Sequence, residues 1–488
     1  MLEGFVKINT HRLVIFLVKE KNELQKDLKT RHITMISIGG VIGAGLFVGS
    51  GTIIQSTGPA AILSYIIGAL MVVLVMRMLG EMAAVNPDSG SFATYAHKAI
   101  GPWAGYTIGW LYWFNWVIII AIEAVLLGAM VNNWFPSIPA WIASIFMIIL
   151  MTITNMYSVK LYGEFEYWLA FIKVAAILVF LGLGIAMIFG IVPGVDRPNF
   201  STISENGGFF PKGIVPVLLS VVFISFSLSG SEVAAIAAGE SENPEKNVIK
   251  AINTVVWRLM LFFVGSVTIL VIFIPWNDAS ALKLPYASLF RMAGVPAAAE
   301  IMNGVVFLSL LSVLNSGLYT SSRMLFSLAK KGDAPLAFSK LNSRGAPIWA
   351  IFASVLFAFV CAMLKFISPD KLFAFLANSS GGVTMLMYMF VAVSHIRLRR
   401  EAERENSGKL KVKMWLFPYL TYATLLMIVT IFVSQAFIAD MRMQFYMTML
   451  ATAIVIASYF LRVRNKPIKE DKAGFPILKG SGIGLEKD

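Results

Sequence analysis

Long apolar segments recur along the whole chain and are separated by short polar connections. About 20 consecutive apolar residues cross the roughly 30 Å hydrocarbon core of a bilayer as a helix. Twelve segments of about this length are present, so the pattern predicts an all-α membrane protein with 12 transmembrane helices. The predicted spans cover approximately 33–54, 60–84, 104–131, 138–157, 163–189, 214–238, 252–275, 298–327, 347–367, 371–395, 414–434 and 443–461.

The first span carries an unusual density of glycine in its middle. It reads ITMISIGGVIGAGLFVGSGTII at 33–54. Glycine is costly in a helix and tolerates other backbone angles, and unwound backbone at mid-membrane is tolerated only where protein or a polar cavity satisfies its N–H and C=O groups. One interpretation is a helix break at 40–45 that lines a binding site. The other is that the glycines permit close helix packing.

The sixth span is interrupted in a similar way. Its centre reads FSLSGSE at 226–232, which is polar and contains glycine, and it lies five spans after the first break. Two interrupted helices at matching places in successive blocks are typical of transporters built from inverted repeats, with the substrate site near the midplane. The spacing therefore predicts a 5+5 repeat, although no residue-level identity links the two halves.

Composition and charge agree with a membrane protein. Of 488 residues, 58% are hydrophobic and 14% are charged, which excludes an ordinary soluble enzyme. If the N-terminus is cytoplasmic, 29 of the 40 Lys and Arg residues lie in cytoplasmic segments and 7 in outer ones. This bias predicts that both termini are cytoplasmic, and it explains the net charge of +13 without a nucleic-acid partner.

These patterns predict a division of the chain into five parts. They are a cytoplasmic N-terminal segment at 1–32, a ten-helix transport core at 33–395 with repeats at 33–189 and 214–395, a basic cytoplasmic loop at 396–413, helices 11 and 12 at 414–461, and a cytoplasmic tail at 462–488. Cys361 is the single cysteine, and the four histidines have no metal-ligand spacing. We therefore expect no cofactor and no metal site.

Ionisable side chains within predicted spans are candidates for function, because each costs about 2.5–3.5 kcal/mol to insert. Lys173 lies near the centre of span five, either paired with a buried acid or replacing a coupling metal ion. Glu232 follows the second break and Glu123 lies in span three; each is a proton carrier or a satisfied buried acid. Arg77 and Glu81 are four residues apart and are expected to form a salt bridge.

The two breaks together suit a zwitterion. A helix N-terminus at Gly43–Gly45 would present amides to a carboxylate. Carbonyls freed near Phe226 and Ser227 would accept an ammonium group, and the Phe226 ring would either gate the pocket or pack. No sodium-site signature is evident, which favours proton coupling. The secondary pocket candidates, which could equally form helix–helix hydrogen bonds, are Asn315, Tyr319 and Ser379.

Six stretches carry a resemblance to a known family. They are LKTRHITMISIGGVIGAGLFVGSG (28–51), MRMLGEMAAVNPDSGSFATYAHKAIGPWAGYTIGWLYW (76–113), SVKLYGEFEYWLAFIKV (158–174), AAGESENPEKNVIKAINTVVWR (237–258), LNSGLYTSSRMLFSLAKKGDAP (314–335) and KMWLFPYLTY (413–422). From about 25 to 465 the chain resembles the amino acid permeases of the amino acid–polyamine–organocation superfamily. The first two stretches favour 4-aminobutyrate (GABA) as the substrate, and permeases for proline, aromatic and basic amino acids share much of the rest.

The resemblance implies a LeuT-type fold in the bacterial cytoplasmic membrane, with alternating access and import of an amino acid by proton symport. It implies that the breaks hold the substrate, that Lys173 takes the place of sodium, and that Glu232 matches the family's acid after the second break. Residues 1–22 extend beyond the family's usual start. The substrate-binding candidates are Ile42, Gly43, Ala44, Gly45, Phe226, Ser227, Ser229 and Gly230.

Other functions compete with this one. Within transport, the alternatives are import or exchange of proline, basic or other α-amino acids, and a cationic substrate is favoured if Glu123 faces the pocket. A nutrient sensor without transport would normally add a soluble output domain. A membrane enzyme would need a catalytic cluster, and the GGVIGAG run lacks the strand–turn–helix context of a dinucleotide site.

Overall fold

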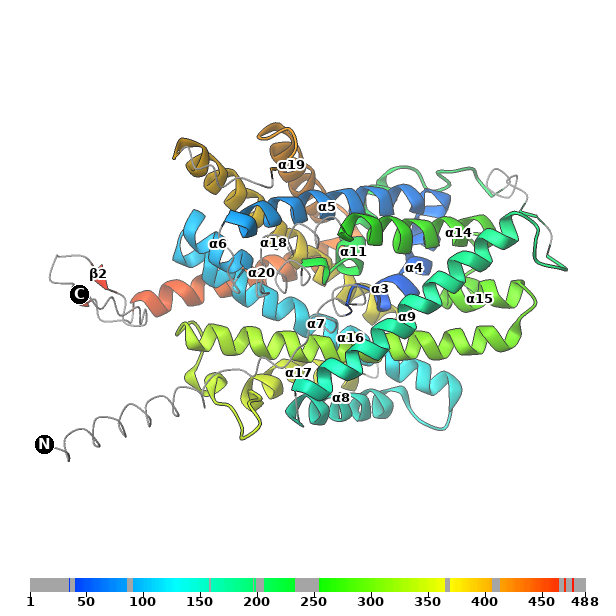
Figure 1. Cartoon of the computed structure of the whole chain (residues 1–488), viewed down its shortest axis with the longest axis horizontal. Helices are drawn as coiled ribbons and strands as arrows, with labels where there is room; N and C mark the ends of the chain where they lie inside the picture. The colour runs from blue at the N-terminus through cyan, green and yellow to red at the C-terminus, as the bar shows by residue number, and fades with distance from the viewer. Residues whose placement is uncertain are drawn as a thin grey trace, which may run out of the picture.

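The described part of the chain is almost entirely helical (Figure 1). In this computed structural model it comprises residues 35, 40–85, 91–157, 159–195, 197–198, 206–232, 254–364, 369–405, 413–464, 469–470 and 476–477. The expected segment 1–32, with its extension at 1–22, lies outside these residues, as does most of the tail expected at 462–488. The prediction of an all-helical membrane protein is confirmed.

Within the described residues, helices lie along the predicted spans, and the largest difference at a described end is that of α18, which continues to Arg404 where the prediction ends at 395. Nine helical stretches of the described residues are long and apolar enough to cross a membrane. The stretch Ala44–Val85 covers the first two predicted spans, and α11 and α17 are shorter apolar helices at the sixth and ninth. The first elements are α3 (Ala44–Phe47), α4 (Gly49–Thr57), the 3₁₀ turn η1 (Gly58–Ala60), α5 (Ala61–Val85), α6 (Ser91–Ala99), α7 (Pro102–Trp134), α8 (Ala140–Tyr157), α9 (Val159–Ile188) and α11 (Val215–Ser227).

The second half of the chain continues this arrangement. Its elements are a π-helical segment η2 (Leu259–Gly265), α14 (Ser266–Phe273), η3 (Ala281–Lys283), α15 (Pro285–Met292), α16 (Pro296–Lys330), η4 (Leu336–Ser339), α17 (Ile348–Met363), α18 (Pro369–Arg404), α19 (Tyr419–Ser434), η5 (Gln435–Phe437) and α20 (Ala439–Arg464). Two-residue strands β1 (Lys469–Glu470) and β2 (Pro476–Ile477) pair antiparallel in the tail. Helix α18 continues through 396–404, so the predicted loop at 396–413 begins as helix.

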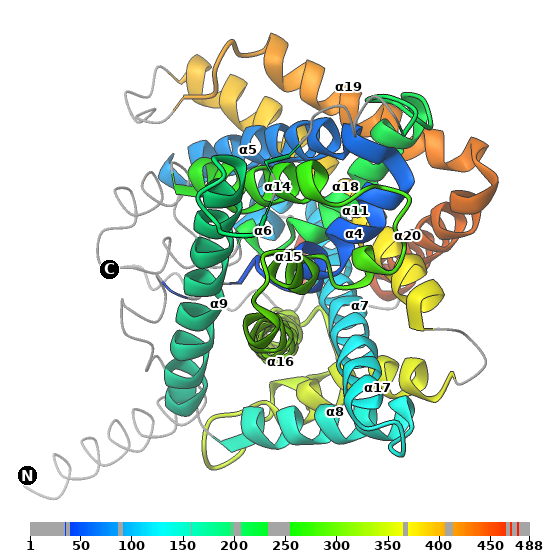
Figure 2. The same cartoon turned by 90° about the vertical axis from the view of Figure 1, so that its right-hand side faces the viewer.

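Helix α7 is the centre of the packing. It begins at Pro102, which suits the first turn because its missing N–H would be unpaired there. Buried side chains lie on all its faces, as expected of a core helix. It packs against α16, α18, α8 and α17, and Figure 2 shows α8 and α17 side by side at one edge of the molecule. Trp113 donates to Ser354 of α17 at 3.1 Å, which adds a polar bond to this packing.

The segment at 276–297, which lies between two of the predicted spans, contains a short helix. Within it, α15 buries Tyr286, whose ring lies 5.0 Å from Phe47 and 4.5 Å from Phe180 between centroids. These contacts join the loop to α3 and α9. This segment therefore packs directly against the helix that follows the first break.

Helices α11 and α18 approach so closely that their contact requires a glycine. A Cβ atom placed on Gly381 would lie 1.8 Å from the carbonyl oxygen of Val222. That oxygen is backbone, so the clash can be relieved only by moving a helix. Helix α11 carries the second break, and this contact fixes its distance from α18.

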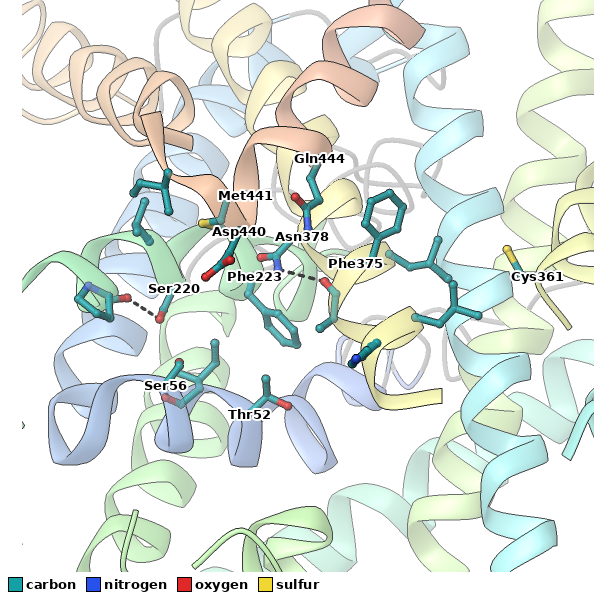
Figure 3. A pocket seen from close by; sticks show the side chains of 18 of the residues that line it. Thr52, Ser56, Ser220, Phe223, Cys361, Phe375, Asn378, Asp440, Met441 and Gln444 are labelled. Carbon is teal, nitrogen blue, oxygen red and sulfur yellow. Dashed lines mark hydrogen bonds between the residues drawn. The ribbon is translucent and has the colours of Figure 1, made fainter. Parts of the chain in front are cut away.

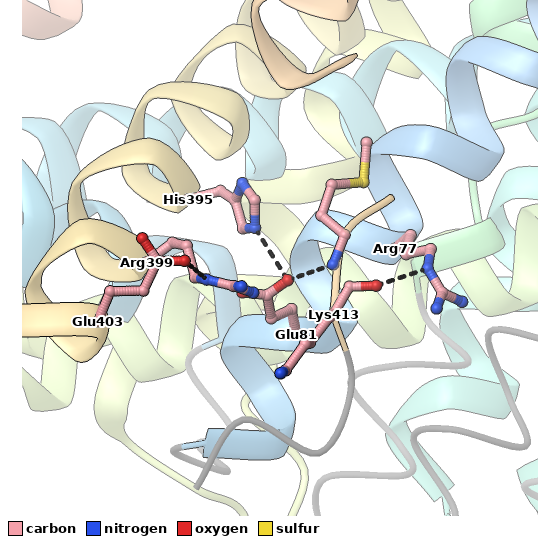
Figure 4. Close-up of polar contacts among 7 residues, drawn as sticks. Arg77, Glu81, His395, Arg399, Glu403 and Lys413 are labelled. Atoms are coloured by element: carbon pink, nitrogen blue, oxygen red, sulfur yellow. Dashed lines mark hydrogen bonds and ion pairs between the residues drawn. The ribbon is translucent and has the colours of Figure 1, made fainter. Parts of the chain in front are cut away.

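A buried polar cluster joins α5 to α18 (Figure 4). The Glu81 carboxylate accepts hydrogen bonds from the Arg399 guanidinium, at 2.6 Å, and from the backbone N–H of Met414. His395 Nε2 lies 3.3 Å from the same carboxylate. Arg399 also pairs with Glu403 at 2.8 Å. A single acid thus connects two helices and the start of the segment before α19.

The expected Arg77–Glu81 salt bridge is wrong. Arg77 instead donates to the carbonyl of Lys413 at 3.1 Å, and its guanidinium lies 4.3 Å from the centre of the Trp415 ring. No ion pair joins it to Glu81 in the described part of the chain. The i, i+4 spacing places the two residues next to each other on the helix, but each side chain binds a partner on another segment of the chain.

We predict that Gly381→Ala destabilises the protein by about 1–3 kcal/mol through overpacking of α11 against α18. The measurement is thermal unfolding of the purified protein in detergent. Gly182→Ala in α9 is the matched control, because a Cβ there meets nothing within 4 Å. Equal melting temperatures for the two variants would show that α11 and α18 are not in this close contact.

We predict that Glu81→Gln lowers the free energy of unfolding by about 3 kcal/mol, because it leaves the mostly buried Arg399 without its main counter-charge. Glu403→Gln removes the other partner of Arg399, which is 47% exposed, and should cost about 1 kcal/mol or less. Thermal unfolding of both variants provides the comparison. A similar loss in both would contradict the central place of Glu81 in the cluster.

Candidate functional site

The first predicted break is present in the described residues. Residues 40–43 are not helical, and α3 begins at Ala44 and leads into α4. Residues 41–43 are buried and Ile42 fully so, which places this part of the unwound backbone inside the protein. Gly39 and the span before it, apart from residue 35, lie outside the described residues. The interpretation of these glycines as a break is favoured over simple helix packing.

The second predicted break is also visible. Helix α11 ends at Ser227, a turn follows at 228–230, and helical geometry returns at Ser231 and Glu232. Gly230 has a φ of 99°, a region that side chains other than glycine rarely adopt. The chain at 233–253 lies outside the described residues. The turn in the polar centre of span six therefore falls on Gly230, and glycine is the residue that best tolerates a positive φ.

The two breaks pack directly against each other. The Ser227 hydroxyl donates to the carbonyl of Gly45 at 3.2 Å. A Cβ atom on Gly45 would lie 2.4 Å from the Cα of Ser227, and one on Gly230 would lie 3.1 Å from the carbonyl oxygen of Gly40. The structure therefore brings together substrate-site candidates that are about 180 positions apart in sequence.

Each of the two candidate acids faces a break. Glu232 folds back, and its carboxylate oxygens accept from the Gly230 N–H at 3.2 and 3.1 Å. Glu123 of α7 accepts from the Ala44 N–H at 3.4 Å, at the start of α3. Both acids are almost fully buried. Each therefore occupies a backbone donor that the interrupted helix exposes.

Lys173 of α9 reaches the first break with its ammonium group. Nζ donates to the carbonyl of Ile42 at 3.2 Å and to the hydroxyl of Ser312 in α16 at 2.8 Å. It also lies 3.9 Å from the carboxylate of Glu166. Glu166 is fully buried and was missed in the sequence analysis, although the charged pair at i and i+7 in an apolar span was a signal for it.

The secondary candidates make contacts of different kinds. Asn315 Oδ1 accepts from Asn155 of α8 at 2.7 Å, and the guanidinium of Arg323 lies 3.2 Å from the centre of the Tyr319 ring. Ser379 donates to the carbonyl of Phe375 in its own helix. The neighbouring Ser380 instead donates across to Asn115 of α7 at 2.6 Å.

Of the other candidates in the second break, Ser229 lies 3.1 Å from the hydroxyl of Thr384 in α18. The ring of Phe226 packs with aromatic neighbours, 5.8 Å from Phe223 and 6.3 Å from Phe373 between centroids. This aromatic group joins α11 to α18. Its packing is observed, and a gating role for Phe226 stays a prediction.

A cavity of about 1150 Å³ lies beside this aromatic group, between α4, α11, α17, α18 and α20 (Figure 3). Phe223 lines it, and Thr52, Asn378 and Gln444 are among its polar groups. None of the predicted substrate-binding residues is in its lining. Phe223 therefore contacts both this cavity and the Phe226 ring of the second break.

Comparisons with known proteins give the chain a family. Residues 32–472 match the family model described as amino acid permease. The chain is 52% identical over 461 residues to the gamma-aminobutyric acid permease of Bacillus subtilis, covering 94% of this chain and 98% of that protein. It is 42% identical to the gamma-aminobutyric acid permease of Escherichia coli, covering 92% and 96%. It is 37% identical to the aromatic amino acid transport protein AroP of Corynebacterium glutamicum, covering 93% and 98%.

Among solved structures, the chain resembles the manganese transporter of Eremococcus coleocola, with a TM-score of 0.58 at 15% identity over 89% of this chain and 94% of that one. At this identity the likeness shows the fold alone, which is of the LeuT type. The family match covers both breaks and all the candidate residues described above. The chain therefore belongs to the amino acid permease family, whose members are transporters and not enzymes.

Proposed function

We propose that the protein imports GABA across the bacterial cytoplasmic membrane by proton symport with alternating access. Two relatives named as gamma-aminobutyric acid permeases, at 52% and 42% identity over almost the whole chain, support the substrate. The contact between Lys173 and the first break supports the coupling. The competing substrates are proline, basic and other α-amino acids, and the competing mechanism is exchange.

The observation that carries the coupling is the 3.2 Å bond from Lys173 Nζ to the carbonyl of Ile42. A charged ammonium group has three donors and no acceptor, and such charge-assisted bonds are about twice as strong as neutral ones. Loss of its proton would weaken its hold on unwound backbone. We propose that the protonation of Lys173 thereby biases the position of the first break, as a bound sodium ion would.

Glu123 connects this proton to the substrate. Its carboxylate occupies the Ala44 N–H, one of the amides that we assign to the substrate carboxylate. Two carboxylates repel each other at such a site, so the substrate takes that place when Glu123 is protonated or turns away. The ammonium group of the substrate is assigned to the backbone of the second break near Phe226 and Ser227. Glu232 at Gly230 would couple the second break in the same manner.

We also propose the full topology of 12 spans with both termini in the cytoplasm and a 5+5 inverted repeat. The charge bias of 29 to 7 supports the orientation. Apolar helices at the sixth and ninth predicted spans, together with Ala44–Val85 across the first two, support the count. The lipid bilayer is then the solvent of the outer helix faces, and the substrate and protons are the functional partners.

We predict that Lys173→Ala reduces proton-driven GABA accumulation in proteoliposomes by about tenfold or more. A positioned proton-transfer group contributes at least this factor to the rate of the step that it serves. Binding of labelled GABA should survive. Lys283→Ala, a change at a lysine in the outer loop, is the control and should behave as wild type. Uptake of proline or arginine in place of GABA by the wild-type protein would overturn the substrate and keep the mechanism.

The topology predicts opposite labelling of two introduced cysteines. Cys361 is the chain's one cysteine and is buried, so Cys361→Ser provides a clean background. Ala279→Cys, between α14 and α15, should react with a membrane-impermeant maleimide in intact cells. Ser343→Cys, between η4 and α17, should react only after permeabilisation. The reverse pattern would contradict the proposed orientation.

A further inference from the structure

Glu166 is a buried acid beside Lys173 that, within the described part of the chain, contacts neither of the two breaks. It lies two turns before Lys173 in α9, which is about 10 Å along the axis at 1.5 Å per residue. The lysine side chain folds back toward it, so that Nζ and the carboxylate are only 3.9 Å apart. Both side chains are shielded from solvent, with exposed fractions of 1% for Lys173 and 0% for Glu166.

A single hydroxyl connects the two groups in one direction. Lys173 Nζ donates to Ser312 Oγ at 2.8 Å, and Ser312 Oγ donates to Glu166 Oε1 at 2.5 Å. A serine hydroxyl can accept one proton while it gives up its own. The three groups therefore form a continuous chain of donors from the ammonium group to the carboxylate.

In the described residues, few other charged groups act on this series of three hydrogen-bonded side chains. Lys173 faces the carbonyl of Ile42 and, electrostatically, the carboxylate of Glu123 in α7. Glu166 faces the polar side chains of Asn315 and Ser316 in α16. Among the titratable groups of the described residues that act on Lys173, Glu166 is therefore the one connected to it through a hydroxyl.

We propose that Glu166 is the proton acceptor of Lys173, with Ser312 as the relay, which rests on the proposed proton symport. An N–H bond of Lys173 breaks as an O–H bond forms on Ser312, and the original Ser312 proton passes to Glu166. The pair changes from ammonium and carboxylate to amine and carboxylic acid, and its net charge stays zero. A neutral pair avoids the cost of buried charge.

This transfer would connect the substrate site to the cytoplasm. In the proposed topology α9 starts at its cytoplasmic end, so Glu166 lies nearer that side than Lys173 does. The neutral amine would release its charge-assisted hold on the Ile42 carbonyl at the same step. Proton release toward the inside thereby loosens the first break, whereas exchange of substrate against substrate proceeds with Lys173 still protonated.

The test compares two activities of reconstituted protein. Counterflow of labelled GABA against unlabelled GABA needs binding and alternating access but no net proton transfer. Acidification of the lumen during GABA uptake, followed with a trapped pH-sensitive dye, needs the proton to cross. We expect Glu166→Gln to keep counterflow within about twofold of wild type and to lower acidification about tenfold or more. Glu164→Gln, in the same helix, is the matched control and should keep both activities.

Ser312 provides a second, independent pair of variants. Ser312→Ala should lower acidification as Glu166→Gln does, whereas Ser312→Thr, which keeps a hydroxyl, should preserve it. Wild-type acidification in Glu166→Gln overturns the relay, and so does a parallel loss of counterflow, which would indicate a structural ion pair. If Glu166→Gln does not fold, equal acidification by Ser312→Ala and Ser312→Thr overturns the proposal. Absence of gradient-driven GABA uptake in the wild type identifies failure of the proposed function itself.

Discussion

The structure depends on satisfying backbone polar groups where two helices are interrupted within the membrane. Each unpaired N–H or C=O in a bilayer costs several kcal/mol, and here side chains supply the partners. Lys173 binds the carbonyl of Ile42, Glu232 binds the N–H of Gly230, and Ser227 binds the carbonyl of Gly45. Every one of these bonds depends on a group that can move or titrate.

The rest of the fold holds these groups in place. Helix α7 packs against α16, α18, α8 and α17, and it presents Glu123 to the start of α3. Helix α16 presents Ser312 to α9. Close glycine contacts set the spacing of α11 from α18. In the proposed mechanism these helices stay in place while the two short breaks respond to the proton on Lys173.

Sequence patterns predicted the helices and their breaks more accurately than they predicted the side-chain contacts. The spans followed from apolar length, and the breaks followed from glycine and polar residues inside those spans. Glu166 was missed because it lies near the start of its span, where an acid is also compatible with an interfacial position. The Arg77–Glu81 pair was wrong because helix spacing says nothing of Arg399 and Lys413, which arrive from distant segments.

A similar limit applies to the neighbouring serines of α18. Ser379 and Ser380 differ by one position, which is about 100° around a helix. Only the packing decides that Ser380 reaches Asn115 while Ser379 bonds within its own helix. Which serine faces the neighbouring helix depends on how the two helices cross, and the amino-acid sequence alone does not specify that crossing.

The peripheral position of α9 has a consequence for the electrical environment of its lysine. One face of this helix holds Lys173 and Glu166, and the opposite face exposes Trp168, at 59%, and Phe171, at 48%. A helix with its side chains is about 10 Å wide, so one layer of protein separates the charged pair from the surrounding lipid. The hydrocarbon of the bilayer is therefore a low-dielectric medium just outside this layer, and it contributes to the electrostatic energy of the two charges.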